Sequence, residues 1–418
     1  MKVTKMKGTL DYFGDSALKY QYLEEKAREI CHRFGFGLVI TPIFEATELF
    51  TRGVGEGSDI VNKEMYTFLD KGERSITLRP EGTASVTRCY VENKLYVTPG
   101  LKKYYYFGPM FRYERPQAGR YRQFTQFGIE ALGPGSSYLD AEIINFASTY
   151  LNEIGFKNIK VLINNIGSGD SRKKYEEALR EHFGKYLDSM CTDCKNRYEK
   201  NPLRILDCKV DKDLDCMKNA PKIFDYLTEE DQKYFTDICD ILNKLGIKYE
   251  ISDRLVRGLD YYTKVVFEFI YDDENSPING LTVLGGGRYN GLSRQFDGPD
   301  TEAIGFACGV ERLIMALDEL GEFKNLNIDA DFQVITIGES AKVEGIKLAN
   351  FLRNNNYYVE IDYVNHNLKP QFKLSERCNA KYLIMIGDEE ISSGIYKVKD
   401  VNNNTEKMLT KEEILKLI

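Results

Sequence analysis

The sequence predicts an α/β protein whose α+β core is an antiparallel sheet flanked by helices, with an inserted helical domain and a smaller second domain. Two runs of alternating residues within segment 107–130 favour paired antiparallel strands. Residues 170–246 are lysine-rich and helical in pattern, and they interrupt the strands and glycines on either side. After residue 331, strands and helices alternate, as in a layered α/β domain. We therefore expect a core at residues 1–325, including the insertion, and a second domain at residues 331–418.

Length, charge and cysteine content narrow the class of protein. At 418 residues the chain is long for one domain, and its net charge of −7 excludes a general polyanion binder. No apolar run approaches the ~18 residues of a membrane span. The first residues lack the apolar core of a signal peptide, so we expect a cytoplasmic protein without a membrane partner. Nine cysteines, an odd number, indicate reduced thiols rather than a disulfide framework.

The first elements are predicted from spacing and from two prolines. Apolar residues at helical spacing predict a helix over residues 16–34. A strand is expected at residues 38–41, and Pro42 places it at a sheet edge or a subunit boundary because proline cannot donate a ladder hydrogen bond. A hairpin turning at residues 70–72 follows, and then a helix entered through Pro80.

Glu81 and Thr83 lie where this strand becomes a helix. Small ligands are often bound at such a transition. A carboxylate in the first turn of a helix can equally act as a cap, because it accepts hydrogen bonds from free backbone N–H groups. The spacing leaves both interpretations open.

The segment at 107–130 is the most informative part of the chain. It carries four arginines around a glycine-containing loop, with Glu114 as their acidic partner: Arg112, Arg115, Arg120 and Arg122. In the return run, Arg122, Phe124 and Gln126 are predicted on one face of the strand. Guanidinium groups bind phosphate bidentately, and an aromatic ring offers a flat surface to a base, so the hairpin suits a nucleotide. A solvated charged hairpin is the alternative.

After a helix at 139–154 and a strand beginning at residue 159, the predicted insertion contains four cysteines. They are Cys191, Cys194, Cys208 and Cys216. Four thiols could bind zinc, but seven residues separate the second pair where two would be usual. The spacing therefore favours unliganded thiols, and we assign no metal site.

The core pattern resumes beyond residue 249. Arg257, Tyr261 and Tyr262 precede a strand at 265–270, and a later strand ends in the three glycines of LTVLGGGRYNGL. That spacing is not the dinucleotide-binding pattern, but consecutive glycines let a ligand or another backbone approach closely. Arg312 falls in the first turn of a following helix, where a cation is unfavourable unless an anion lies nearby. An ordinary exposed arginine is the alternative.

The second domain is predicted from its element order. A domain of this size is short for a second enzyme, so a binding module is the natural interpretation. The expected elements are strands at 332–337, 358–363 and 382–386, helices at 342–354, 369–379 and 411–418, and a hairpin around 402–404.

These segments, in this order, resemble the class II aminoacyl-tRNA synthetases. TPIFEATELF resembles motif 1, whose proline lies at the dimer interface, FGPMFRYERP with RYRQFTQFGIE resembles motif 2, and GFACGVERLIMAL resembles motif 3. RGLDYYT and GGGRYNGL are more specific, because they match the two histidine-binding segments of the histidyl-tRNA synthetase family. The resemblance covers nearly the whole chain and implies the class II antiparallel sheet with a C-terminal anticodon-binding domain.

The resemblance also implies residue roles. Arg112 would hold the α-phosphate of ATP, Phe124 would stack on adenine, and Arg312 would hold the γ-phosphate end. Arg257 would supply positive charge at the α-phosphate. Catalysis would fall to Arg257, Arg112 and Gln126, and Glu114 and Arg120 would complete the ATP site. The histidine site would comprise Arg112, Arg257, Glu81, Gly82, Thr83, Gln126, Glu130, Tyr261, Tyr262 and Tyr289, closed by the backbone of residues 285–287.

The implied reaction is histidine–tRNA ligation. Histidine and ATP would form histidyl-AMP and pyrophosphate, and histidine would pass to the 3′ end of tRNA(His), with Mg2+ on the outer phosphates and a homodimer as the working form. This chemistry needs preorganised cations and alignment but no protein nucleophile. The chain's three histidines, all outside the motifs, are therefore no obstacle.

Three alternatives remain. A regulatory paralogue of histidine biosynthesis would share the core but lack the second domain, and its arginine positions would drift. A synthetase for another amino acid would share the three motifs but not RGLDYYT and GGGRYNGL. An RNA-binding scaffold on an inactive core would bind substrates without pyrophosphate exchange.

Overall fold

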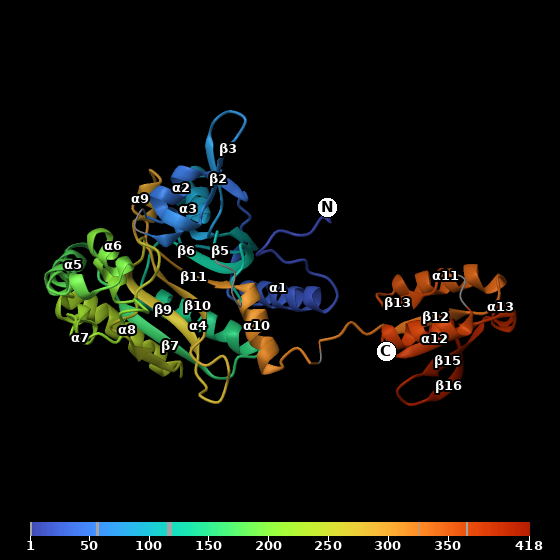
Figure 1. The fold of residues 1–418 in the computed structure, drawn as a ribbon. Helices are drawn as coiled ribbons and strands as arrows, with labels where there is room; N and C mark the ends of the chain where they lie inside the picture. The colour runs from blue at the N-terminus through green and yellow to red at the C-terminus, as the bar shows by residue number, and fades with distance from the viewer. Residues whose placement is uncertain (1, 56–57, 115–118, 325, 365–366) are drawn as a thin grey trace. The chain divides into compact units, whose positions relative to one another are not determined.

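The computed structural model describes residues 2–418 except 56–57, 115–118, 325 and 365–366. Arg115 of the arginine-rich loop therefore lies outside the described residues. The chain divides into two compact units, Met1–Lys324 and Asn325–Ile418 (Figure 1). Among the described residues, no helix has the length and apolar character needed to cross a bilayer.

The first unit is built on a sheet of eight strands among the described residues, in the order β1-β5-β6-β11-β10-β9-β7-β8. All neighbours are antiparallel except β1 with β5 and β7 with β8, which confirms the predicted antiparallel core. The strands are β1 (Gly37–Leu38), β5 (Lys102–Phe111), β6 (Gln123–Leu132), β7 (Ile159–Asn165), β8 (Tyr249–Ile251), β9 (Thr263–Tyr271), β10 (Thr282–Arg288) and β11 (Ala303–Gly309).

Helices α1 (Asp15–Arg33), α4 (Ser137–Glu153) and α10 (Val310–Leu320) pack together over β6 and β11. Their contact with the sheet is aromatic. The Phe127 ring of β6 lies 4.8 Å from that of Tyr150, and Phe146 lies 5.6 Å from Phe306, measured between ring centroids. Side chains alternate along a strand, so Phe127 faces the helices while its neighbour Gln126 faces the opposite side of the sheet. Because the helices do not cover the side that Gln126 faces, polar side chains can lie on that side of the sheet.

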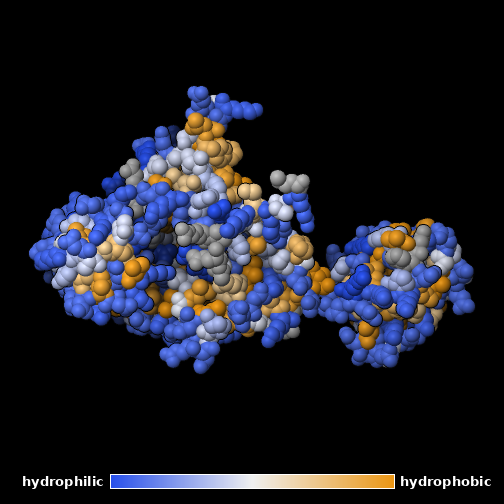
Figure 2. All heavy atoms as spheres, viewed as in Figure 1, coloured by the Kyte–Doolittle hydropathy of each residue, from blue (hydrophilic) through white to orange (hydrophobic). Residues whose placement is uncertain are grey.

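A smaller sheet, β2-β4-β3, holds the hairpin predicted around residue 70. Asp70 closes the turn, because its Oδ1 accepts a hydrogen bond from the Gly72 N–H at 2.8 Å. The elements here are β2 (Phe44–Ala46), α2 (Thr47–Gly53), a single π-helical turn η1 (Ile60–Glu64), β3 (Tyr66–Leu69), β4 (Ser75–Leu78), α3 (Thr83–Glu92) and η2 (Leu95–Val97). Figure 2 shows hydrophobic side chains gathered at the foot of this hairpin.

The strand expected at residues 38–41 ends earlier, at Leu38. It does lie at the edge of the large sheet, as Pro42 predicted. Directly beyond Leu38 the Val39 N–H still donates to the Tyr105 carbonyl oxygen of β5 at 2.9 Å. The Arg79 side chain binds the backbone that follows: its Nη1 donates to the Thr41 carbonyl oxygen at 2.8 Å, and its Nε donates to that of Pro109 at 2.9 Å. The buried guanidinium thus joins the edge to β5.

Between β7 and β8 the chain forms a helical region, the segment predicted as an insertion. Its apolar side chains, among them Tyr175, Leu179, Phe183 and Ile205, belong to the same core cluster as Tyr261 and Tyr289 of the main sheet region. The helices and turns are α5 (Gly169–Gly184), η3 (Leu187–Ser189), α6 (Thr192–Lys200), η4 (Pro202–Ile205), α7 (Asp215–Lys218), η5 (Ile223–Asp225) and α8 (Glu229–Lys244). One further short helix, α9 (Leu292–Gln295), follows the glycine-rich strand β10.

The second unit has a five-stranded sheet among its described residues, in the order β13-β12-β14-β15-β16. The first three strands are parallel and the last two antiparallel. The elements are β12 (Phe332–Thr336), α11 (Ser340–Arg353), β13 (Val359–Ile361), α12 (Leu368–Arg377), β14 (Tyr382–Ile386), α13 (Asp388–Ser393), β15 (Ile395–Asp400), β16 (Thr405–Thr410) and α14 (Lys411–Ile414). The layered α/β class is confirmed. Helix α13 was not predicted, and the terminal helix is shorter than residues 411–418.

Candidate active site

The site begins at the N-terminus of α3, where Glu81 acts as a cap. Its two carboxylate oxygens accept hydrogen bonds from the backbone N–H groups of Thr83 at 2.7 Å and Ala84 at 2.8 Å. Helix N-termini leave such donors without partners, and a carboxylate also suits the positive end of the helix dipole. Burial raises the pKa of Glu81, and the two backbone donors oppose that rise. The capping interpretation is therefore confirmed, and a contact between Glu81 and a ligand stays a prediction.

Gln126 connects α3 to strand β6. Its Oε1 accepts hydrogen bonds from the Gly82 N–H at 3.0 Å and from the Tyr106 hydroxyl at 3.1 Å. A Cβ atom on Gly82 or Gly128 would lie 2.3 or 2.4 Å from atoms of the Tyr106 ring, so only glycine fits at either position. The sequence does not single out Tyr106, because nothing in the run KKYYYFG distinguishes one tyrosine from the next.

Glu130, four residues further along β6, is the most deeply buried carboxylate of the group. It accepts hydrogen bonds from the Thr83 hydroxyl at 2.7 Å and from the Tyr289 hydroxyl at 2.5 Å. Burial raises the pKa of Glu130 to about 8, although both hydroxyls act to lower it. The strand β6, the helix α3 and the glycine-rich segment after β10 thus meet at one carboxyl group.

The raised pKa makes stability depend on pH with a definite sign. The ordinary value is 4.5, so between about pH 4.5 and 8 the folded protein holds a proton on Glu130 that the unfolded chain does not. This contribution to the free energy of unfolding is therefore lost as pH rises through that window. We expect wild type to lose stability relative to Glu130→Gln between about pH 5 and pH 8, measured by urea unfolding. The exposed-site variant Glu92→Gln is the control, and parallel profiles for wild type and Glu130→Gln would contradict the assignment.

Tyr261 and Tyr262 line the same side of the sheet. Their ring centroids lie 4.7 Å apart, and that of Tyr261 is 5.7 Å from that of Tyr289. The guanidinium of Arg257 lies 5.7 Å from the centroid of the Tyr262 ring. These contacts, together with those of Glu130 and Gln126, bring together all the residues predicted for the histidine site except Arg112. Arg112 lies with the residues predicted to bind the nucleotide.

Arg257 is held by Glu268, a β9 residue that the sequence did not identify. The two form an ion pair through Arg257 Nη1 and Glu268 Oε1. Burial opposes the charged form, but Glu268 raises the pKa of Arg257 above its ordinary value. Among the described residues the buried Arg257 Nε has no hydrogen-bond partner, so a donor remains for a ligand. A Cβ on Gly285 would lie 2.5 Å from Arg257 Nη1, which explains one glycine of the GGG run.

The arginine-rich hairpin forms as predicted, with Met110 opposite Phe124 in the register of β5 and β6. Arg112 lies 5.2 Å from the centroid of the Phe124 ring, and its Nε donates to the carbonyl oxygen of Pro80 at 2.8 Å. Glu114 lies 3.9 Å from Arg112 and 3.3 Å from Arg120. These four side chains are the nucleotide residues that the sequence grouped together.

Arg122 departs from the predicted alternation. Its guanidinium lies over the ring of Tyr113, 4.1 Å from the centroid, instead of joining Phe124. The reason is that β5 ends at Phe111 and β6 begins at Gln123, so strict alternation does not extend to residues 113 and 122. The Arg122 backbone instead donates to the carbonyl oxygen of Gly8 in the N-terminal arm at 2.7 Å.

Arg312 occupies the first turn of α10 as predicted. Its Nη1 donates to the Thr282 carbonyl oxygen at 3.1 Å. Burial lowers the pKa of Arg312, and repulsion from Arg120 and Arg112 lowers it further. The preceding residue, Glu311, anchors the turn because its carboxylate accepts the Thr125 N–H of β6 at 2.8 Å. Three guanidinium groups close enough to repel one another favour binding of a polyanion.

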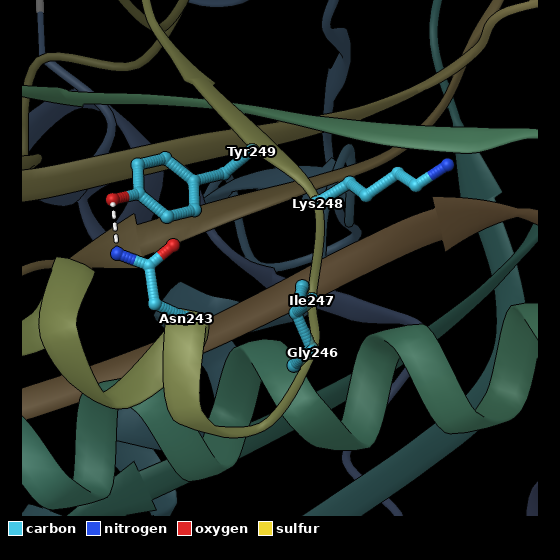
Figure 3. A pocket seen from close by; sticks show the side chains of 5 residues that line it. All are labelled: Asn243, Gly246, Ile247, Lys248 and Tyr249. Carbon is cyan, nitrogen blue, oxygen red and sulfur yellow. Dashed lines mark hydrogen bonds between the residues drawn. The ribbon is translucent and has the colours of Figure 1, made fainter.

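A hollow elsewhere in the first unit, shown in Figure 3, has none of these features. It is lined by Asn243, Gly246, Ile247, Lys248 and Tyr249, where α8 leads into β8. The Asn243 side chain donates to the Tyr249 hydroxyl at 3.1 Å, and the Lys248 side chain points away from this hydrogen-bonded pair. A hydrogen-bonded pair without converging charged groups is weak support for a ligand site, so the polar side of the large sheet remains the candidate.

Known proteins resemble this chain over nearly its whole length. A family model described as histidyl-tRNA synthetase matches residues 8–313, and one described as an anticodon binding domain matches residues 331–418. The chain is 47% identical to a histidine–tRNA ligase of Staphylococcus haemolyticus, over 95% of this chain and 94% of that protein. It is 48% identical to one of Anoxybacillus flavithermus, over 94% and 93%. A crystal structure of apo S. aureus histidyl-tRNA synthetase matches with a TM-score of 0.85 at 38% identity, covering 99% of each chain.

Proposed function

Because the chain belongs to the histidyl-tRNA synthetase family, we propose that the network around Glu130 and Arg257 is where it activates histidine. It is a histidine–tRNA ligase by relationship: it converts L-histidine and ATP to histidyl-AMP and pyrophosphate, and then transfers histidine to the 3′ end of tRNA(His). The observation that supports the placement is the meeting of a buried carboxylate, an ion-paired arginine and a cluster of arginines on one face of one sheet.

Glu130 is proposed to hold polar N–H groups of the substrate histidine. A carboxylate has roughly four acceptor positions, and Thr83 and Tyr289 use two of them. Substrate N–H donors can use the others, and a cationic partner favours the ionised form of Glu130. An amino acid without those donors would leave a buried carboxylate unpaired, and this penalty is the basis of sharp discrimination. The walls of the histidine pocket would be formed by Tyr261, Tyr262, Gln126 and the N-terminus of α3.

ATP is proposed to lie along the arginine-rich hairpin. Phe124 offers a ring for adenine, Arg112 reaches the α-phosphate, and Arg312 meets the outer phosphates, where positive charge is already crowded. Glu64 and Glu114 would supply oxygen ligands for Mg2+. The two carboxylates lie close enough for repulsion from Glu114 to raise the pKa of Glu64, which burial also raises. Mg2+ at these carboxylates would neutralise charge on the outer phosphates.

The activation step then needs alignment and charge stabilisation. The carboxylate of histidine attacks the α-phosphorus, the bond to the bridging oxygen breaks, and pyrophosphate leaves with the electron pair. Arg112 and Arg257 would stabilise the negative charge that develops on the α-phosphate oxygens. The ion pair with Glu268 holds the Arg257 guanidinium in place before substrate binds, and Gly285 leaves room for it.

Amino-acid-dependent ATP–pyrophosphate exchange tests the assignment. We expect exchange with histidine alone among the proteinogenic amino acids, and loss of exchange when Mg2+ is omitted. No exchange with any amino acid, in protein shown to be folded, would favour the regulatory or scaffold alternatives. Two features argue against both alternatives. The second unit matches an anticodon-binding model, and the chain has all three phosphate-binding candidates, Arg112, Arg257 and Arg312.

A homodimer is proposed from the edge of the first unit. Large apolar side chains are exposed along β1, β2 and β3 and the chain between them: Leu38, Ile40, Ile43, Phe44, Phe68 and Leu69. An apolar patch of this kind beside an edge strand suits a second copy of the chain. Sedimentation equilibrium is expected to give twice the chain mass of 48.1 kDa, and a single-chain mass at assay concentrations would contradict the proposal.

The cytoplasm is the proposed compartment. None of the nine cysteines, all of them within the described residues, forms a disulfide, which suits a reducing environment. Cell fractionation tests this, and recovery with an exported fraction would contradict it.

A further inference from the structure

Three cysteines and one aspartate converge in the helical region between β7 and β8. Cys191 and Cys194 lie at the start of α6, and Cys208 and Asp211 lie beyond η4. One ligand atom from each of the four falls within 4.8 Å of every other. Cys194, Cys208 and Asp211 are buried, and Cys191 is partly buried. None of these residues takes part in the site described above.

The spacing of the sulfur atoms is that of a tetrahedral metal site. Cys191 Sγ and Cys208 Sγ are 3.7 Å apart. Two thiolates at about 2.3 Å from a tetrahedral zinc ion lie about 3.8 Å from each other, whereas sulfur atoms in a disulfide are about 2.05 Å apart. The observed separation therefore matches a shared ion and not a bonded pair.

Backbone groups also orient the four ligands. The Cys191 N–H donates to Asp211 Oδ2 at 3.0 Å, and the Asp211 N–H donates to Cys208 Sγ at 3.4 Å. Such outer hydrogen bonds are typical of metal sites, where they hold the ligands in place and stabilise thiolate charge. Two segments separated in sequence are thereby held around one point.

We infer that Cys191, Cys194, Cys208 and Asp211 bind a structural zinc ion. Four protein ligands close the coordination shell, which is the mark of a structural rather than a catalytic zinc site. Cys216, the fourth cysteine of the sequence pattern, lies in α7 and is not part of the group. The seven-residue interval that argues against a four-cysteine site is therefore irrelevant, because Asp211 takes the fourth position.

The ion would stabilise the segment that contacts the candidate active site. Between the two ligand pairs, the Asn201 side chain donates to Asp260 Oδ1 at 2.8 Å, and Arg204 Nη2 donates to Asp59 at 2.7 Å. Asp260 directly precedes Tyr261 of the proposed histidine pocket. Zinc would thus fix α6 and η4 as a support for that wall without touching substrate.

Metal analysis of untagged protein purified without chelators tests the inference. We expect about one zinc per chain in wild type and in Cys216→Ser, a matched buried cysteine in the same region, and less than about a tenth in Cys194→Ser. Cobalt-substituted wild type should show the intense ligand-field absorption of a tetrahedral sulfur-rich site, and Asp211→Ala should alter that spectrum. The inference would be overturned if wild type contained no zinc, if it contained stoichiometric iron instead, or if Cys194→Ser retained zinc.

A measurement on wild type alone covers the case in which Cys194→Ser fails to fold. Titrating the folded protein with a mercurial thiol reagent, in the presence of a chromophoric zinc indicator, should release zinc as the cluster thiols react. Chelation should also lower the melting temperature of wild type while leaving that of metal-free protein unchanged. Thiol modification without zinc release would overturn the inference. Neither result depends on aminoacylation activity, so the proposed function is tested separately.

Discussion

Arg257→Ala is expected to lower histidine-dependent pyrophosphate exchange by about 10²- to 10³-fold, mainly in kcat, while the chain stays folded. The guanidinium has a buried Nε without a hydrogen-bond partner among the described residues, and Glu268 holds it in the charged form. Alanine removes the donor that we propose acts on the α-phosphate, and it leaves the proposed nucleotide contacts of Phe124 and Arg112 in place. The KM for ATP should therefore change far less than kcat.

Glu268 supplies the control for this experiment. Removing Arg257 leaves the partly buried Glu268 carboxylate without its cation, which itself destabilises the fold. The double variant Arg257→Ala/Glu268→Gln should recover stability in thermal unfolding without recovering exchange. Arg33→Ala, which breaks a surface pair with Glu153, should leave exchange unchanged. Exchange by Arg257→Ala within about fivefold of wild type would contradict the role, since a fivefold change corresponds to only about 1 kcal/mol.

Ending the chain after Lys324 is expected to reduce tRNA charging by about 10²-fold or more, a loss of about 3 kcal/mol, while exchange changes little. The second unit has its own hydrophobic core, formed by residues such as Phe332, Val334, Leu352 and Ile384. All the proposed catalytic residues lie in the first unit. The truncated protein should therefore still activate histidine, but it would lack the unit that matches an anticodon binding domain.

Parallel assays of the two steps measure the effect. Single-turnover transfer from preformed histidyl-AMP, with tRNA concentration varied, should show the loss as weaker tRNA binding. Equal losses in exchange and charging would mean that the second unit supports the core instead. A point variant in that unit distinguishes the cases: Lys373→Glu changes an exposed charge on α12 without disturbing the buried core, and should affect charging only if this face meets tRNA.

Local chemistry made much of the fold predictable from the sequence. Alternation around Met110 and Phe124 identified an antiparallel hairpin, and Pro42 identified an edge, because both depend on the geometry of a single strand. Helical spacing and loop composition separated the inserted helices and the second unit. Element ends were less predictable, as the early end of β1 at Leu38 shows, because the residues that follow a strand make contacts with distant parts of the chain, as the Thr41 carbonyl oxygen does with the Arg79 side chain.

Apart from what the family resemblance implied, the sequence showed the candidate site only as separate motifs. The sequence by itself determined which residues are charged, aromatic or glycine, and on which face of a strand each falls. Only the tertiary structure decided that Tyr289 bonds Glu130 across 159 residues, that Glu268 holds Arg257, and that Asp211 rather than Cys216 completes the thiol cluster. The physical reason is that strand periodicity acts over a few residues, whereas these partners meet through sheet register and loop packing between distant segments.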